Sequence, residues 1–177
     1  MQVVHIQEEP KSLLLNLFLT LIMGLALLYF GAIGFVFETR KKIFNREFMD
    51  QFNEEHCKHF PEAQQAPSMG YPDTGCGRYA AKLTYSDWLD MNNAQRVHIN
   101  YFEMITFTLV VSLVAFSGYP KVTVAALGAH LVGRVVYSIG YSRYGPFYRA
   151  PGAITMLVAN SVLLMTAGCS VANLMGY

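Results

Sequence analysis

The most constraining feature of this sequence is the apolar run from Leu13 to Phe37, which contains no charged residue. A helix needs about 20 predominantly apolar residues to cross ~30 Å of hydrocarbon, and this run is longer than that. Hydrophobic residues make up 53% of the 177-residue chain and charged residues 14%, and the apolar residues are gathered in blocks. A soluble helical core is the alternative, and a charge-free run of this length disfavours it.

Three further apolar blocks reach spanning length together with their flanks. We therefore predict an all-α integral membrane protein, an up-down bundle of four transmembrane helices formed by residues 1–177 as a single domain. The expected helices cover about residues 12–37, 87–116, 122–141 and 153–175, and a long polar connection over about 43–86 joins the first two. The turn from Ser117 to Pro120 makes the second and third helices antiparallel neighbours.

The distribution of positive charge predicts how the helices are oriented. Of the 13 Lys and Arg residues, eight lie between residues 40 and 96 and two more lie between the third and fourth helices, against two on the opposite side. By the positive-inside rule, the first and third connections face the cytosol or an equivalent compartment. The membrane is predicted to be that of the endoplasmic reticulum or the mitochondrion. The net charge of +1 gives no indication of a nucleic-acid partner.

The cysteines and histidines give no framework for a disulfide or a metal site. Cys57, Cys76 and Cys169 show no CxxC spacing. The stretch His56-Cys57-Lys58-His59 contains residue types that bind zinc, but it has only three of them, with a lysine in their midst. We interpret it as a solvated surface cluster and expect no metal.

A polar stripe follows the second helix where it meets the apolar segment. Arg96, Asn100 and Glu103 stand at positions i, i+4 and i+7, so a helix projects all three from one face. A cation, an amide and a carboxylate are costly to desolvate near a membrane. The three side chains must therefore meet one another, another helix, water or a polar ligand.

A second polar stripe lies on the third helix, where His130, Arg134, Tyr137 and Tyr141 also share one face. Both stripes lie toward the basic side of the membrane. Together they predict one pocket with several cations, phenols, an amide and a carboxylate. Cations suit the carboxylates of a ligand, and Glu103 suits an ammonium group, so the inventory fits a small zwitterionic ligand of net negative charge.

The two motifs resemble those of a known family. The pattern Arg-x-x-x-Asn-x-x-Glu at 96–103, followed by Gly-Arg-x-x-Tyr-x-x-Gly-Tyr at 133–141, is similar to the MAPEG family of membrane proteins in eicosanoid and glutathione metabolism. Within it, the chain is most similar to the microsomal glutathione transferase type 3 branch, which also has a counterpart of the basic anchor at 40–42. The resemblance covers about residues 13–175.

The resemblance implies a homotrimer in the lipid bilayer, with glutathione as co-substrate between neighbouring subunits. By position it assigns glutathione contacts to Arg40, Arg96, His98, Asn100, Glu103, Arg134, Tyr137 and Tyr141. The family's thiol-activating arginine falls on Tyr148 when no gap is allowed, and Arg149 follows it, so Arg149 is the candidate by proximity. Tyr141 or Tyr137 would then donate a hydrogen bond to the sulfur, and we assign the catalytic role to Arg149 together with Tyr141.

Two departures from the family's sequence pattern bear on whether the chain is an enzyme. Relatives commonly have a proline shortly after the helix-two glutamate, whereas this chain continues with Met104 to Phe107, and the first connection carries an extra segment at about 46–69.

We favour a glutathione-dependent transferase or peroxidase that acts on lipophilic electrophiles or lipid hydroperoxides. The alternative is a non-catalytic accessory subunit that docks through residues 46–69 onto a larger membrane complex, such as an organellar respiratory assembly. An ion or proton pathway is disfavoured because one carboxylate and one deep histidine make a poor relay.

Overall fold

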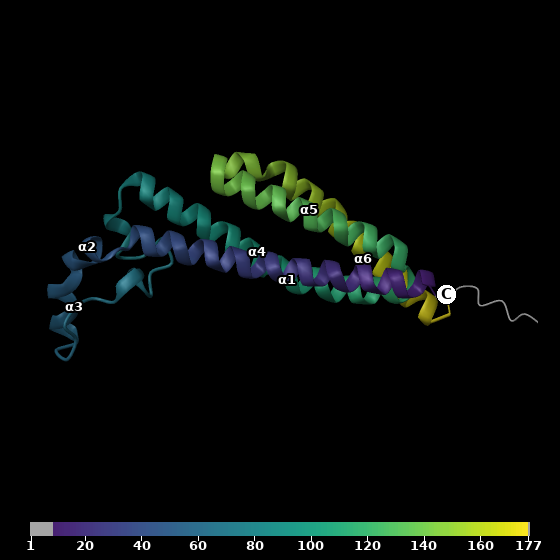
Figure 1. The fold of residues 1–177 in the computed structure, drawn as a ribbon, viewed down its shortest axis with the longest axis horizontal. Coiled ribbons are helices and arrows are strands. Elements are labelled where there is room, and N and C mark those ends of the chain that lie inside the picture. The colour runs from purple at the N-terminus through teal and green to yellow at the C-terminus, as the bar shows by residue number, and fades with distance from the viewer. Residues whose placement is uncertain (1–8, 177) are drawn as a thin grey trace, which may run out of the picture. The chain divides into compact units, whose positions relative to one another are not determined.

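The computed structural model describes residues 9–176, and its regular structure in this range is entirely helical. The four helices in this range that are long and apolar enough to cross a membrane are α1 (Glu9–Ile43), α4 (Tyr85–Gly118), α5 (Pro120–Tyr144) and α6 (Ala150–Leu174) (Figure 1). The predicted all-α membrane fold with four spanning helices is therefore confirmed. Residues 1–8 and 177 of the predicted domain lie outside the described residues.

Several helix boundaries differ from those expected from apolar length alone; α5, for example, runs from Pro120 to Tyr144 where about residues 122–141 were expected. α1 continues through its basic anchor to Ile43 instead of ending near residue 37. Lys and Arg are good helix formers, and their charge is favourable in a last turn. α6 begins at Ala150 instead of residue 153, because Pro151 occupies the first turn, where proline sacrifices no helical hydrogen bond.

The described residues form two compact units: those up to Tyr29 together with those from Asn100 onward (unit 1), and residues 30–99 (unit 2). α1 and α4 each contribute to both. Whether the whole chain behaves as one domain stays a prediction.

Unit 1 is a helical bundle with two apolar clusters. One cluster joins three helices through Phe18, Leu25, Tyr101 and Leu127, and the other joins α4, α5 and α6 through Ala115, Ala126, Leu163 and Ala167. α5 and α6 lie side by side (Figure 1). Their contact depends on Gly152, because a Cβ there would be 2.3 Å from the backbone N of Tyr137 and 2.5 Å from the carbonyl oxygen of Gly133.

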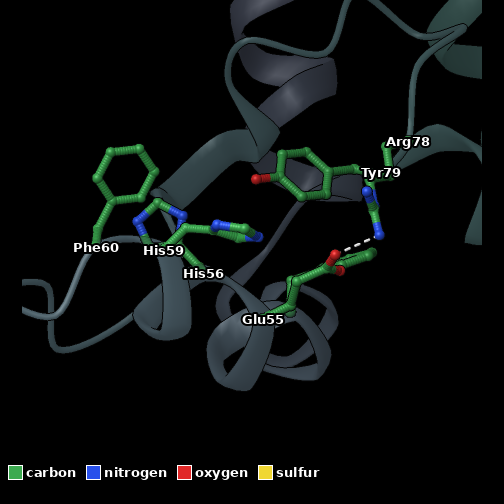
Figure 2. A pocket seen from close by; sticks show the side chains of 7 residues that line it. Glu55, His56, His59, Phe60, Arg78 and Tyr79 are labelled. Atoms are coloured by element: carbon green, nitrogen blue, oxygen red, sulfur yellow. Dashed lines mark hydrogen bonds and ion pairs between the residues drawn. The ribbon is translucent and has the colours of Figure 1, made fainter.

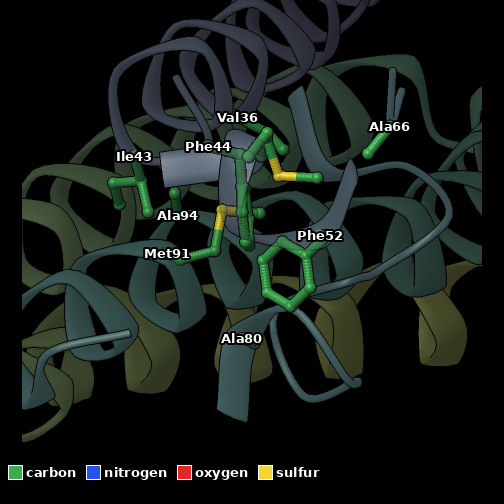
Figure 3. Packing of buried hydrophobic residues seen from close by; sticks show 9 residues of the cluster. Val36, Ile43, Phe44, Phe52, Ala66, Ala80, Met91 and Ala94 are labelled. Carbon is green, nitrogen blue, oxygen red and sulfur yellow. The ribbon is translucent and has the colours of Figure 1, made fainter. Parts of the chain in front are cut away.

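Unit 2 contains the polar connection, which is folded and not merely a loop. Its short helices are α2 (Arg46–Met49), η1 (Asp50–Phe52), α3 (Asn53–His59), η2 (Ser68–Gly70) and η3 (Ala80–Lys82). Residues of α2, η1, η3 and the intervening chain pack with the ends of α1 and α4 in one apolar cluster, which consists of Val36, Ile43, Phe44, Met49, Phe52, Ala66, Ala80, Met91 and Ala94 (Figure 3). The apolar residues scattered through this polar segment thus supply a core of its own.

The second half of the connection is organised by the carboxylate of Asp73. Its Oδ1 accepts hydrogen bonds from the backbone N–H groups of Gly75 at 2.8 Å and Gly77 at 2.9 Å, and its Oδ2 accepts one from Ala80 at 2.8 Å. Burial raises the pKa of this carboxyl, but the N–H groups of Ala80, Gly75, Gly77 and Tyr79 together lower the pKa to below its ordinary value. The ionised side chain therefore fixes the turn.

Candidate functional site

The polar stripe of α5 is buried. His130, Arg134, Tyr137 and Tyr141 all lie in the interior of the chain, and Arg134 is only 1% exposed. An arginine so enclosed within a spanning helix is costly unless its charge is compensated.

Arg134 is held by an amide and two aromatic rings. Its Nη1 donates a hydrogen bond to Oδ1 of Asn100 at 2.9 Å. Its guanidinium carbon lies 4.6 Å from the ring centroid of Tyr101 and 5.2 Å from that of Tyr137. Among the described residues neither ion pair involves Arg134, and its buried Nε has no hydrogen-bond partner. The positive charge is therefore stabilised by the Asn100 amide and by the faces of the two rings. The Nε–H group remains able to donate a hydrogen bond to a further acceptor.

Tyr101 is a member of this cluster that the sequence patterns missed. Its hydroxyl donates a hydrogen bond to the carbonyl oxygen of Leu25, which connects α4 to α1. The side chain is 2% exposed. Tyr101 directly follows Asn100, so it does not share the helix face of Arg96, Asn100 and Glu103. Only its position next to this motif could have indicated its part in the cluster.

A cavity of about 400 Å³ lies beside this cluster in unit 1. Three predicted site residues, Asn100, Tyr137 and Arg149, line it. Its remaining lining is apolar and comes from Met104 and the first turns of α6, including Ile154, Met156 and Leu157. The cavity thus combines an amide, a phenol and a guanidinium with a lining that is otherwise apolar.

Arg149 is placed by the connection between α5 and α6. It ends the short helix η4 (Pro146–Arg149), and its guanidinium carbon lies 5.5 Å from the ring centroid of Tyr141. Tyr148, which occupies the gap-free position, is 58% exposed and is not among the residues that line the cavity. The chain approaches α5 closely here, because a Cβ on Gly140 would be 2.3 Å from the carbonyl oxygen of Tyr148.

The other predicted residues are placed differently. Arg96 and Glu103 are exposed on α4. Arg40 and His98 line a separate cavity inside unit 2, where Arg40 is buried. The chain described here therefore brings together Asn100, Arg134, Tyr137, Tyr141 and Arg149 as one cluster, and Arg40 with His98 as another.

The histidine-rich stretch of the connection lines an open groove. His56 and His59 lie with Phe60 on one side of it, and Glu55 forms an ion pair with Arg78 on the other (Figure 2). Lys58 and His59 are exposed, whereas His56 and Cys57 are half-buried. Within residues 9–176, no group of three or more His, Cys, Asp or Glu side chains is arranged to hold a metal ion.

The cluster lies on spanning helices whose sequence was compared with known proteins. The sequence pattern of the MAPEG family matches residues 14–169, which include all four spanning helices nearly completely. No curated protein matches the chain. The match covers most of the sequence and agrees with the four apolar helices. The chain belongs to the MAPEG family.

Proposed function

We propose that this protein is a glutathione-dependent transferase or peroxidase that acts on lipophilic electrophiles or lipid hydroperoxides in a membrane. The observation that carries the proposal is the cavity in unit 1, where Asn100, Tyr137 and Arg149 meet an apolar lining. Glutathione-related chemistry belongs to the family of the chain. A close relation to the type 3 branch of the microsomal glutathione transferases is part of the same proposal.

The residues of the cluster suit glutathione by their charge and hydrogen-bonding capacity. The guanidinium groups of Arg134 and Arg149 favour carboxylates, and Asn100 offers an amide already oriented by Arg134. Glu103, which is exposed, would meet the ammonium group of the ligand. Arg40, Arg96 and His98 remain glutathione contacts that only the resemblance assigns.

The chemistry would depend on ionisation of the thiol. A free thiol has a pKa of about 8.5 and is largely protonated at neutral pH, whereas the thiolate is the nucleophile. Arg149, with a hydrogen bond from Tyr141 or Tyr137, would favour the thiolate. The thiolate would then attack an electrophilic carbon in a substrate that enters through the apolar lining, and form a thioether as the leaving group departs with its electron pair. With a hydroperoxide it would attack an oxygen of the O–O bond, which breaks to release the alcohol and leaves a sulfenic acid. A second glutathione would then displace water from the sulfenic acid and form the disulfide.

We also propose that a homotrimer completes the site in a membrane of the endoplasmic reticulum or the mitochondrion. Arg96 and Glu103 are charged, exposed and on a spanning helix, which is costly in lipid and favourable at an interface with a polar ligand. The competing proposal is an accessory subunit. The folded connection favours it, because its short helices with their own core offer a surface for a partner.

One experiment separates these functions. The full chain, purified in detergent, is tested for thermal stabilisation by glutathione and for conjugation and peroxidase activity against several lipophilic substrates. The enzyme proposal requires both stabilisation and turnover. Absence of both, together with co-purification of other membrane subunits, would establish the accessory role instead. The oligomeric state, measured by native mass spectrometry, tests the homotrimer directly.

A further inference from the structure

Tyr101 contacts both α1 and α5 from its position on α4. Its hydroxyl donates a hydrogen bond to the carbonyl oxygen of Leu25, and its ring centroid lies 5.7 Å from that of Tyr29, one turn further along α1. On the α5 side, the guanidinium carbon of Arg134 lies 4.6 Å from the centroid of the same ring. Three helices of unit 1 therefore meet at one side chain.

The contacts with α1 restrain the orientation of the Tyr101 ring. A carbonyl oxygen has two lone pairs, so the Leu25 oxygen can accept the hydroxyl in addition to its bond within the helix. The side chain is buried, so water does not compete for this hydroxyl. A ring that is bonded at its hydroxyl and packed beside Tyr29 keeps one orientation toward α5.

Asn100 and Tyr101 restrain the guanidinium of Arg134 in different ways. The hydrogen bond from Nη1 to Oδ1 of Asn100 fixes the position of one nitrogen atom but permits rotation about the bond. The negative face of an aromatic ring attracts a cation, and this attraction is stronger where water is excluded. The ring of Tyr101 therefore restricts the rotation that the single hydrogen bond allows.

Through Arg134, the restraint reaches two residues that line the cavity of unit 1. Asn100 accepts the hydrogen bond from Arg134, and the ring centroid of Tyr137 lies 5.2 Å from the guanidinium carbon. Tyr101 is not among the residues that line this cavity. Its effect on a ligand must therefore pass through its neighbours. Groups that are already held in place lose less conformational freedom when a ligand binds, so affinity is higher.

We propose that Tyr101 is a positioning residue of the candidate site. It holds Arg134, and thereby Asn100 and Tyr137, in the arrangement that binds glutathione. Glutathione as the ligand is taken from the proposed function, whereas the restraint of Arg134 follows from the contacts of the chain alone. Loss of the ring should weaken glutathione binding, whereas loss of the hydroxyl alone should mainly reduce stability.

Substitutions at Tyr101 separate these two effects in the full chain purified in detergent. Tyr101→Leu should weaken glutathione affinity by about tenfold, because the ring face is lost. Tyr101→Phe keeps the ring and should change affinity by less than about twofold, while the midpoint of thermal unfolding falls with the loss of the bond to Leu25. Phe18→Leu is the matched control, because Phe18 is a buried member of the same apolar cluster and stacks on Phe116. It should lower stability without a comparable loss of affinity.

A second measurement needs no ligand. In protein labelled with ¹⁵N-arginine, the Nε–H signal of Arg134 is assigned by its loss in Arg134→Lys, and its hydrogen exchange with water is followed by NMR. This Nε is buried, and Tyr101→Leu should accelerate its exchange, whereas Tyr101→Phe and Phe18→Leu should not. A trifluorinated phenylalanine incorporated in place of Tyr101 keeps the ring shape but makes its face less negative. It should bind glutathione more weakly than Tyr101→Phe does, and it replaces Tyr101→Leu if that variant does not fold.

The outcomes distinguish this role from the proposed function. The positioning role is overturned if Tyr101→Leu leaves the exchange of the Arg134 Nε–H unchanged, even if glutathione binds. It is also overturned if Phe18→Leu changes exchange and affinity as much as Tyr101→Leu does, or if the fluorinated ring binds glutathione as well as Tyr101→Phe. Faster exchange in Tyr101→Leu, combined with no binding of glutathione to the unaltered protein, would support the restraint of Arg134 and reject the proposed function.

Discussion

Nη1 of Arg134 donates a hydrogen bond to Oδ1 of Asn100 at 2.9 Å, and this bond joins the polar faces of α5 and α4 within unit 1. The two stripes that stand far apart in the sequence thus pair directly through one residue from each. The pairing also orients the Asn100 amide, because its oxygen is committed to the guanidinium. The side of the cavity formed by Asn100 is therefore fixed before any ligand enters.

Asn100→Ala should destabilise the bundle, because it removes the only hydrogen-bond acceptor found for Arg134 among the described residues. A hydrogen bond to a charged group contributes about 1.5–3 kcal/mol, and the loss should appear as a lower midpoint of thermal unfolding in detergent. Asn173→Ala is the control, because Asn173 donates to the Tyr119 hydroxyl at an exposed position. Equal losses of stability in the two variants would show that the hydrogen bond between Asn100 and Arg134 contributes no more than an exposed hydrogen bond.

Gly152→Ala should disturb the contact between α5 and α6. The new methyl group would meet the backbone of Tyr137 and Gly133, which cannot rotate away as a side chain can. Overpacking of this kind typically costs about 1–3 kcal/mol, measured as a loss of thermal stability. Gly168→Ala on the same helix meets nothing within 4 Å and should leave stability nearly unchanged. A tolerated Gly152→Ala would contradict the close approach of the two helices.

Under the proposed function, Arg149→Ala should lower turnover more than it weakens glutathione binding. The guanidinium favours the thiolate, and a rise of one unit in the pKa of the bound thiol reduces the thiolate fraction near neutral pH by up to about tenfold. The measurement compares kcat with the glutathione affinity, and raising the pH should restore part of the lost rate. Tyr148→Ala, at the exposed neighbouring position, should affect neither. Equal losses in kcat and affinity for Arg149→Ala would remove its catalytic role.

Asp73→Asn should destabilise the connection in a pH-dependent way. The folded protein holds the pKa of this carboxyl below its ordinary value, because the backbone N–H groups outweigh the effect of burial. Its stabilising contribution is therefore fully present above the unfolded pKa and is lost as the pH falls through the lower folded pKa. The difference in unfolding free energy between the unaltered protein and Asp73→Asn should be constant near neutral pH and shrink in acid.

The control for this titration is Asp50→Asn, because Asp50 is exposed and pairs with Arg46 on the surface. Its effect should be small, since exposed ion pairs contribute about 0–1 kcal/mol. Hydrogen exchange at the amides of Gly75, Gly77 and Ala80 localises the effect of Asp73→Asn. Unchanged protection of these amides in Asp73→Asn would show that the carboxylate does not organise the turn.

The four spanning helices could be predicted from the sequence because each apolar run extends over many residues. The charge-free run from Leu13 to Phe37 leaves few alternatives to a spanning helix, and the spacing of Arg134, Tyr137 and Tyr141 places them on one face of α5. The family follows from the same features. Boundaries such as the continuation of α1 to Ile43 were missed, since helix-forming basic residues extend a helix beyond its apolar part.

The contacts of the site were decided by the tertiary structure. Periodicity places a side chain on a face but does not say which neighbour it meets, so the stacking of Tyr101 on Arg134 and the bond from Thr108 to Asn160 of α6 at 3.2 Å were not predicted. The same holds for Arg40, whose burial under Tyr71 depends on a fold in the connection more than 20 residues further along the chain. The sequence by itself determined that four helices span and which faces are polar, because both depend on local composition and helical geometry. Only the tertiary structure decided which polar groups meet, because desolvated charges take their partners from whichever segments the packing brings near.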